Sequence, residues 1–517
     1  MNLKNITAAS AFLIYASPSF AIFWGGDGFY SLRGVALTDP GSKGSGTYQV
    51  IEQHLGLRAE ARVNDRSSFF LGLDLDPNNR ESGILGGGSK ANTLDTAPNP
   101  SALKFGATYA RVATDYCVIE AGRRPRNWGY GVLLSAAQKP FQSNESLYDG
   151  FTCDVNLQKS QTLGFSVGYD KITEGTSNTS ELTRGDDIDQ VFFTIEYDDR
   201  LGASSSALTK KIGIYVANLT ASDSPLVGKT DIKYLDFYGR FTGFKTFGLM
   251  TEVIFRNGKS ADNAWSSYGS APGTSAKVDT VALAARLEMI LASSGISPEV
   301  ESSVPASSHV LFVEHLRAPG DQDSYYRGNK QLNPSGPEDS YSSITSENRD
   351  SNAQALAFNR NFKPLHILFN GRDGGRNDLR GVYESNRMVN ANLTTFGYKF
   401  SSNQNGYFEA KIGKASLAEI APEAVKDYWA KIDSTNEATE KAARDNRGID
   451  VASQLPVGLY SANLGTEIDL SYTLPGTKDF KTTLTGAYFT PGDALKTSYS
   501  TALKAQTLLQ VQIDVAL

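Results

Sequence analysis

The chain has 517 residues, a formal net charge of -6 at pH 7 and a mean hydropathy of -0.32. The negative charge argues against nucleic acid as a partner, and no stretch offers the roughly 20 consecutive apolar residues that a transmembrane helix requires. The 48 glycines, 24 tyrosines and only 2 cysteines are typical of an exported β-rich protein.

Residues 1–21 have the pattern of a secretory signal peptide. Lys4 supplies a positive charge, residues 6–16 are apolar and too short to span a bilayer, and Ser19-Phe20-Ala21 forms a small-x-small cleavage site. We therefore expect the mature chain to begin at Ile22 and to form one domain over residues 22–517. The alternative is a buried N-terminal strand.

Alternation of apolar and polar residues follows the signal peptide along the chain. Successive side chains of a strand point to opposite faces, so this period of two predicts strands that are apolar on one side and polar on the other. The predicted strands cover residues 29–37, 48–63, 68–76, 102–113, 115–124, 149–158, 161–173, 189–199, 209–220, 231–242, 245–256, 278–291, 308–317, 390–401, 406–414, 458–474, 479–490 and 505–517.

These patterns predict an all-β fold, a transmembrane antiparallel β-barrel of about 18 strands, with a range of 16–20. In the strand at 458–474, Ile468 and Leu470 alternate with Glu467 and Asp469. A carboxylate facing lipid is unfavourable, so the acidic face should line a hydrated interior. Tyrosines near strand ends are expected in the interfacial belts; they are Tyr109, Tyr169, Tyr197, Tyr472 and Tyr488.

The connections between predicted strands sort by parity. With the first strand starting in the periplasm, connections from odd to even strands are long, and most connections from even to odd strands are tight. Two even-to-odd connections, 200–208 and 292–307, are longer than the rest. Short periplasmic turns and long extracellular loops are typical of outer-membrane barrels.

The two cysteines, Cys117 and Cys153, lie on neighbouring predicted strands, on the apolar face. They are expected at different heights, which favours two free thiols that face lipid. A disulfide, which the periplasm permits, is the alternative.

The densest cluster of charge and aromatic residues is Gly-Arg-Arg-Pro-Arg-Asn-Trp-Gly-Tyr-Gly, at residues 122–131. It follows a strand and enters a long connection, and Asp149 opens the next strand. Three arginines within four positions repel one another unless acids or an anionic ligand neutralise them. Trp128 and Tyr130 offer flat faces for stacking on sugars. The alternative is a solvated rim loop with no specific role.

This local pattern resembles the porin-like and alginate-export families of outer-membrane barrels, in which a strand ending in Gly-Arg leads to Trp-Gly-x-Gly and, after a loop, to a strand that starts with Asp-Gly. The resemblance implies a channel of about this strand number in which basic residues narrow the pore. The matching positions are Arg123, Arg124, Arg126, Trp128 and Asp149. The chain departs from the pattern in its mixed-charge lumen and in ending with Leu517 rather than Phe.

Two long loops have internal character. In 318–389, residues 361–369 are apolar amid polar neighbours, and we expect them either to fold into the mouth as a constriction or to pair as an extra hairpin. In 415–457, residues 417–447 carry apolar side chains at helical spacing. A surface helix that caps the rim is favoured there over a pore plug.

Inward-facing charges complete the set of candidate residues. Facing rows of arginine and carboxylate tune which solutes pass through a pore, although opposite charges could also brace the wall with no role in transport. Besides the five matching positions Arg123, Arg124, Arg126, Trp128 and Asp149, the constriction candidates are Tyr130, Arg58, Arg62, Glu120 and Arg286.

The sequence does not suggest an enzyme. The four histidines are scattered, and no nucleophile elbow, phosphate loop or dinucleotide motif is present. We therefore expect no catalytic residue, no metal site and no cofactor.

The leading hypothesis is an outer-membrane channel for passive or substrate-biased passage of small hydrophilic solutes or saccharides. The alternatives are a non-conducting barrel that binds a partner or surface polysaccharide through its loops, and a secreted soluble β-protein. The expected partners are outer-membrane lipid and lipopolysaccharide, the barrel assembly machinery, and a small solute or saccharide.

Overall fold

A computed structural model describes most strand-forming parts of the chain. The described residues are 23–38, 47–75, 103–136, 146–156, 163–173, 188–199, 209–221, 230–244, 247–260, 276–294, 307–320, 356, 358–359, 362–369, 383–384, 387–402, 405–420, 461–477, 479–496 and 504–517. The predicted signal peptide, 1–21, lies outside them, as does the predicted helix beyond residue 420.

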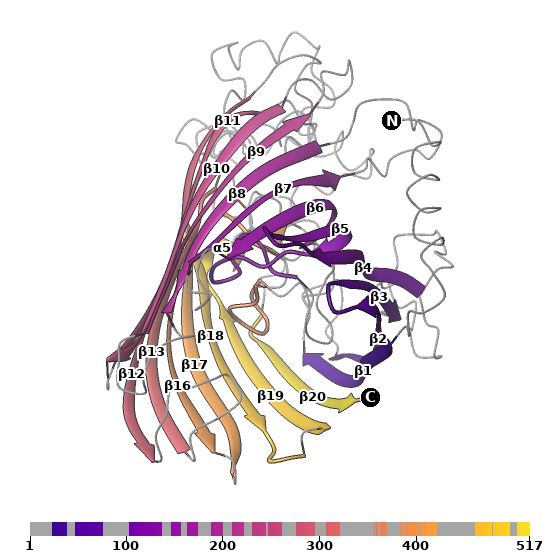
Figure 1. Ribbon diagram of the computed structural model, residues 1–517. Helices are drawn as coiled ribbons and strands as arrows, with labels where there is room; N and C mark the ends of the chain where they lie inside the picture. Colours follow the sequence, from indigo (N-terminus) through magenta and orange to yellow (C-terminus); the bar gives the residue numbers. More distant parts are fainter. Residues whose placement is uncertain are drawn as a thin grey trace, which may run out of the picture.

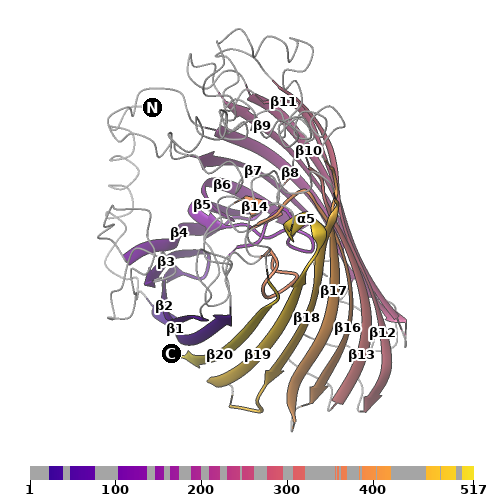
Figure 2. The same ribbon diagram turned by 180° about the vertical axis from the view of Figure 1, so that it is seen from behind.

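Eighteen antiparallel strands form one closed barrel, which confirms the predicted fold class and strand number. β1 pairs with both β2 and β20, so that Ser31 lies between His54 and Asp514, and this double pairing closes the wall. Figures 1 and 2 show β1 and β20 side by side near the C-terminus. The strands are β1 (Phe23–Thr38), β2 (Thr47–Asn64), β3 (Ser67–Leu75), β4 (Leu103–Ala113), β5 (Val118–Pro125), β6 (Leu147–Asn156), β7 (Leu163–Thr173), β8 (Ile188–Asp198), β9 (Thr209–Ala221), β10 (Thr230–Phe244), β11 (Phe247–Ser260), β12 (Ala276–Ser294), β13 (Ser307–Ala318), β16 (Ala391–Ser402), β17 (Gly406–Leu417), β18 (Asn463–Thr473), β19 (Phe480–Pro491) and β20 (Gln506–Ala516).

Strand ends differ most from the sequence prediction where glycine or a turn intervenes. β1 begins at Phe23, six residues earlier than predicted, because Gly25, Gly26 and Gly28 remain in register with β2. β5 begins at Val118 because residues 114–117 form the turn that precedes it, and β18 begins only at Asn463.

The two faces of the barrel wall differ in polarity. Ile468 and Leu470 point outward and are 45% and 49% exposed, whereas Glu467 and Asp469 on the same strand are buried inside. The wall is therefore apolar outside and polar inside, as the alternation predicts.

Tyr109, predicted to lie in an interfacial belt on the outer face, points into the barrel instead. Tyr109 stacks on Phe70 inside the barrel, with ring centroids 4.6 Å apart. The cause is a register shift between β3 and β4 at Leu71 and Leu73, which reverses the alternation of β4.

Most short connections lie at one end of the barrel and most long connections at the other, although 199–208 and 295–306, at the end with the short turns, are longer than the rest there. Residues 65–66 and 114–117 join strands at the first end, whereas 261–275, 319–390 and 418–462 belong to the second. The second end is therefore the extracellular one if the chain follows the rule for outer-membrane barrels.

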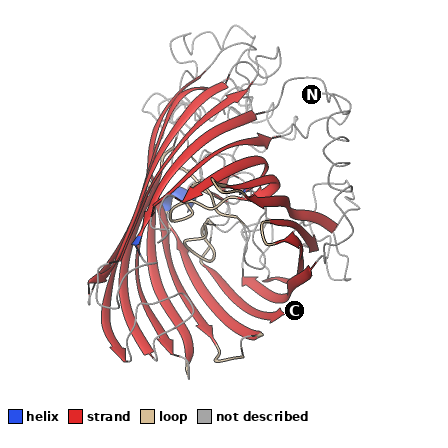
Figure 3. Cartoon of the chain, in the orientation of Figure 1, coloured by secondary structure: helices blue, strands red, loops and turns tan. Residues whose placement is uncertain are grey.

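The ring of strands encloses several loop segments, drawn in tan in Figure 3. The short helix α5 (Asp493–Lys496) packs against β18 and β19. The hairpin of β14 (Tyr383–Glu384) and β15 (Arg387–Met388) is separate from the barrel sheet, so it adds no strand to the wall. Among the described residues, no helix is long and apolar enough to cross a bilayer.

The expectation of free thiols is wrong, because Cys117 and Cys153 form a disulfide with a Cα–Cα distance of 5.6 Å. Cys153 faces Ile119 across the ladder, so Cys117 lies diagonally opposite it in the turn before β5. The two cysteines were predicted at different heights because β5 was predicted to begin at residue 115, which placed Cys117 within the strand instead of in the turn before it. A turn residue is free of the ladder and can reach the neighbouring strand.

Candidate channel interior

The arginine-rich motif continues from β5 into a tight loop inside the barrel. The backbone N–H of Trp128 donates to Leu134 O at 3.1 Å, and that of Gly131 donates to Trp128 O at 3.0 Å. Trp128 is 8% exposed, and its ring centroid lies 5.7 Å from that of Tyr215 on β9. Residues 126–136, which we call the first inward segment, therefore lie against the inner wall.

A buried carboxylate on β11 holds the first inward segment. Glu252 accepts hydrogen bonds from the backbone N–H groups of Tyr130 and Leu133, the second at 3.3 Å. Gly129 has a φ of 58°, and a Cβ at this position would lie 2.6 Å from the Glu252 carboxylate. Glycine is thus required where the loop crosses this side chain.

Tyr130 links the first inward segment to a charged cluster on β12 and β13. Its hydroxyl donates to Glu314, and Arg286 Nη1 donates to the same hydroxyl at 3.5 Å. Burial, and then the charge of Glu314, raise the pKa of Tyr130, so the phenol remains a donor. Arg286 also donates to Glu288 at 2.8 Å and lies 3.9 Å from the Phe312 ring centroid. Two of the predicted site residues, Tyr130 and Arg286, are therefore in contact.

Arg124 and Arg126 are neutralised by a shared acid. Arg124 Nη2 and Arg126 Nη1 each donate to a different carboxylate oxygen of Asp170 on β7, the latter at 3.2 Å. Arg126 also lies 3.5 Å from the Phe192 ring centroid, a cation–π contact. Arg124 is only 2% exposed. These two arginines brace the wall, which is the alternative stated for the inward-facing charges. The alternative stated for the motif, a solvated rim loop, does not fit them because both are buried.

Arg123 and Asp149 point to the outer side of the wall. They are bound by two hydrogen bonds of 3.0 and 2.8 Å, and their side chains are 45% and 43% exposed. Their neighbour on the same face, Phe151, is also exposed. This pair lies away from the lumen.

Residues 362–369 form a second inward segment, held in a similar way. Glu467 on β18 accepts hydrogen bonds from three successive backbone N–H groups, those of His366, Ile367 and Leu368, at 2.7–2.9 Å. Lys411 donates to Pro364 O at 2.6 Å and lies 3.4 Å from Asp469. This segment folds inward and adds no strand to the barrel, which agrees with the first of the two predicted outcomes.

The two inward segments contact each other. Asn359, just before the second segment, donates its backbone N–H to Val132 O at 2.7 Å and its side chain to Ser146 Oγ at 2.8 Å. The rings of Tyr130 and Phe362 meet edge to face, with centroids 5.6 Å apart. Together the segments narrow the lumen from the end with the long connections.

Solvent-exposed arginines line the opposite part of the inner wall, near the end with the short turns. Arg58 and Arg62 on β2 are both exposed, as predicted, and Arg62 donates to Glu60 at 2.8 Å. Arg111 on β4 lies 3.9 Å from Glu120, another predicted residue. The sequence analysis missed Arg111 because the register shift in β4 moves it to the inner face.

Comparison with known proteins assigns the chain to no family. No family model and no curated protein matches it. Among solved structures it is similar to the Pseudomonas aeruginosa outer membrane protein OpdK, with 10% identity, 95% of this chain and 99% of that chain covered, and a TM-score of 0.42. Pseudomonas aeruginosa OpdQ is also similar, with 10% identity, 96% of this chain and 98% of that chain covered, and a TM-score of 0.45.

A third similar structure is Wzi, an Escherichia coli outer membrane protein involved in group 1 capsule assembly and described as a carbohydrate-binding β-barrel. It shares 10% identity over 93% of this chain and 83% of that chain, with a TM-score of 0.42. Similarity at this identity and TM-score transfers no solute and no binding residue to this chain. The resemblance to alginate-export barrels stays a prediction.

Proposed function

We propose that this protein is an outer-membrane channel through which small hydrophilic solutes or saccharides pass, passively or with substrate bias. The observation that carries the proposal is a closed 18-stranded wall, apolar outside, with exposed arginines and half-buried carboxylates inside. A barrel of this strand number is wide enough for an aqueous channel unless loops fill it. Export, removal of residues 1–21 and insertion by the barrel assembly machinery belong to the same proposal.

The second candidate function is a non-conducting barrel that binds a partner or surface polysaccharide. One observation favours it: both inward segments are fastened to the wall, and their apolar side chains pack in the interior. Leu365, Ile367 and Phe369, for example, are at most 1% exposed. In this case the loops would act as a binding surface, and the lumen would be closed.

Single-channel recording in planar bilayers distinguishes the two functions. Steady open-channel current from the purified full chain supports the channel. A correctly folded barrel that stays silent supports the binding barrel and contradicts the channel.

Measurements of ion selectivity on arginine variants identify which charged side chains affect the ions that pass through the lumen. We expect Arg62→Ala combined with Arg111→Ala to shift the reversal potential toward cation preference, because both side chains are exposed to the lumen. Arg123→Ala is the matched control, since this arginine lies on the outer face, and it should leave the reversal potential unchanged. A shift in the control alone would place the selectivity region elsewhere.

A further inference from the structure

The two inward segments are joined at Asn359, the residue that lies just before the second segment. Its backbone N–H donates to Val132 O at 2.7 Å, and its side-chain nitrogen donates to Ser146 Oγ at 2.8 Å and to Leu133 O at 3.4 Å. Asn359 and Ser146 are both buried. The segments are therefore joined by buried hydrogen bonds, which are costly to leave unmade.

Ser146 connects this contact to both ends of the first inward segment. Its carbonyl oxygen accepts the backbone N–H of Arg126 at 2.9 Å, and its hydroxyl accepts the backbone N–H of Ser135 at 3.0 Å. The same hydroxyl accepts the hydrogen bond from Asn359, since its oxygen has two lone pairs. A shift of Asn359 therefore disturbs the place where the first inward segment begins and ends.

Aromatic rings make a second contact between the segments. The Phe362 ring meets the Tyr130 ring of the first segment edge to face, and it meets the Phe358 ring in the same way, with centroids 5.7 Å apart. Phe358 is buried, and its backbone N–H donates to Met388 O at 2.8 Å. Edge-to-face pairs stabilise the packing beyond the burial of the rings. Each segment therefore supplies part of the surface on which the other packs.

The carboxylates that hold the two segments lie too far apart to touch. Glu252 lies on β11 and Glu467 on β18, five strand pairings away around the wall. Neighbouring strands are about 4.8 Å apart, so the path along the wall is about 24 Å. The direct contacts between the segments then offer the route by which one carboxylate affects the segment that the other one holds.

We propose that the two inward segments form a single plug, in which loosening of one segment loosens the other through Asn359. Loss of either carboxylate removes support from both segments, because each packs on the other. Such coupling is reciprocal, so Glu252 affects the second segment as Glu467 affects the first. In a conducting barrel the lumen then opens in one step rather than two; only this last consequence rests on the proposed function.

Hydrogen exchange of the purified full chain in detergent, measured by mass spectrometry, tests the coupling. In Glu467→Ala, residues 362–369 should exchange faster because three of their N–H groups lose an acceptor. Residues 126–136 should also exchange about tenfold faster, although no contact between them and Glu467 is seen in the described part of the chain. In Glu252→Ala we expect the reverse, with a similar rise at residues 362–369.

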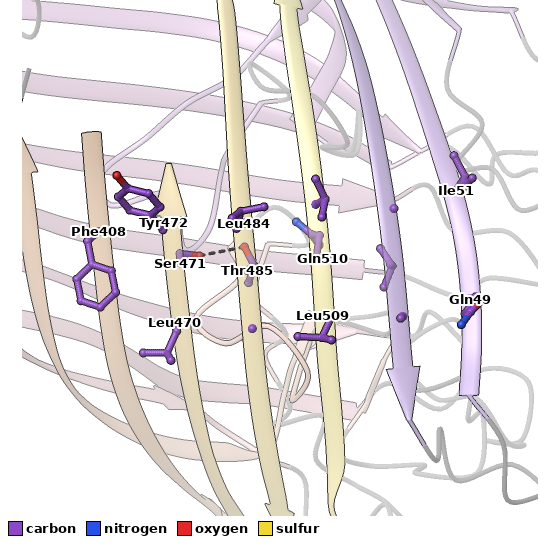
Figure 4. A pocket seen from close by; sticks show the side chains of 15 residues that line it. Gln49, Ile51, Phe408, Leu470, Ser471, Tyr472, Leu484, Thr485, Leu509 and Gln510 are labelled. Atoms are coloured by element: carbon purple, nitrogen blue, oxygen red, sulfur yellow. Dashed lines mark hydrogen bonds between the residues drawn. The ribbon is translucent and has the colours of Figure 1, made fainter. Parts of the chain in front are cut away.

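Ser471→Ala is the matched control, because Ser471 lies on β18 like Glu467. Its hydroxyl lies 3.1 Å from that of Thr485 on β19, the pair joined by a dashed line in Figure 4. Within the described ranges neither hydroxyl is seen to contact an inward segment, so the control should leave the exchange of both segments unchanged. Residues 506–516 of β20 are the internal reference and should exchange as in wild type in every variant.

Asn359→Ala should separate the two segments. In this background Glu467→Ala should still speed exchange at residues 362–369 but leave residues 126–136 at the rate of Asn359→Ala alone. If Asn359→Ala does not fold, Phe362→Leu, which removes the ring contact with Tyr130, should reduce the tenfold effect.

Three outcomes overturn the inference. Unchanged exchange of residues 126–136 in Glu467→Ala contradicts a single plug, and so does an equal rise in β20, which would mean that the whole barrel loosens. Coupling that persists at full strength in Asn359→Ala contradicts Asn359 as the link. A barrel that conducts no current contradicts the proposed channel but not the coupling, because exchange is measured without current.

Discussion

Arg124 and Arg126 show how one acidic residue offsets the repulsion between closely spaced arginines of the motif. Both bind Asp170, which lies two strands away. Gly122, Gly150 and Asp170 share one row across β5, β6 and β7. A Cβ at Gly150 would lie 2.6 Å from the Asp170 carboxylate, so this glycine leaves room for the arginines to reach it.

This arrangement makes Asp170 a structural acid. Asp170→Asn would leave two arginines without their shared carboxylate in a buried site, and we expect the free energy of unfolding to fall by about 3–5 kcal/mol. Denaturant unfolding in detergent measures it. Asp115→Asn, in the exposed pair with Arg66 at the short turns, is the control and should cost about 0–1 kcal/mol. If both variants lost equally little unfolding free energy, Asp170 would not be the residue that stabilises the two buried arginines.

Sequence reasoning could state that the arginines need acids, but it could not name the acid. The distance from Arg124 to Asp170 depends on the register of three strands, and the sequence does not fix that register. The same limit explains Arg111, whose inward position depends on a register shift that no local pattern reveals.

At the scale of elements, strand number and strand faces followed from the period-two alternation. Each strand keeps one face apolar, so the pattern is visible along the chain; β4, where a register shift reverses the alternation, is an exception. The inward path of residues 362–369 was expected only as one of two outcomes, because apolar residues in a loop fit either a plug or a hairpin. What decides between them is a distant carboxylate, Glu467.

Removing that carboxylate should release the second inward segment. Glu467→Ala deletes the acceptor of three backbone N–H groups, so we expect a larger or noisier single-channel conductance. We also expect a loss of about 3 kcal/mol in unfolding free energy, the upper end for a hydrogen bond to a charged group. Glu409→Ala on the neighbouring strand β17 is the matched control, since no contact between Glu409 and the segment is seen among the described residues. Unchanged conductance in Glu467→Ala would show that the second inward segment keeps its position without the hydrogen bonds to Glu467.

The disulfide acts on another element, the junction of β5 and β6. It closes a loop with a sequence separation of 36 residues, so its removal should free the unfolded chain and lower the free energy of unfolding by about 2–4 kcal/mol. Cys117→Ala with Cys153→Ala should show this loss in denaturant unfolding. Wild type treated with reductant should match the double variant, and a double variant as stable as oxidised wild type would contradict the expectation.

At the scale of the whole molecule, the proposed function assigns hydrocarbon to the outer surface and water to the inner one. A closed barrel satisfies every backbone hydrogen bond within its wall, which is the condition for crossing a bilayer with strands. The exposed apolar face and the charged inner face then need different solvents. A soluble protein with this much outward apolar surface would aggregate.

Site-directed spin labels test this division across the wall. Labels at Ile468→Cys and Ile513→Cys, both on the outward face, should be accessible to oxygen and shielded from a water-soluble relaxation agent in reconstituted membranes. A label at the adjacent inward position, Gln512→Cys, should show the opposite accessibility if the lumen is hydrated, and the native cysteines do not interfere because they are paired. Full hydration at both outward positions would mean that the barrel does not sit in a bilayer. Shielding of position 512 from both agents would instead indicate a lumen filled by protein, which favours the non-conducting barrel over the channel.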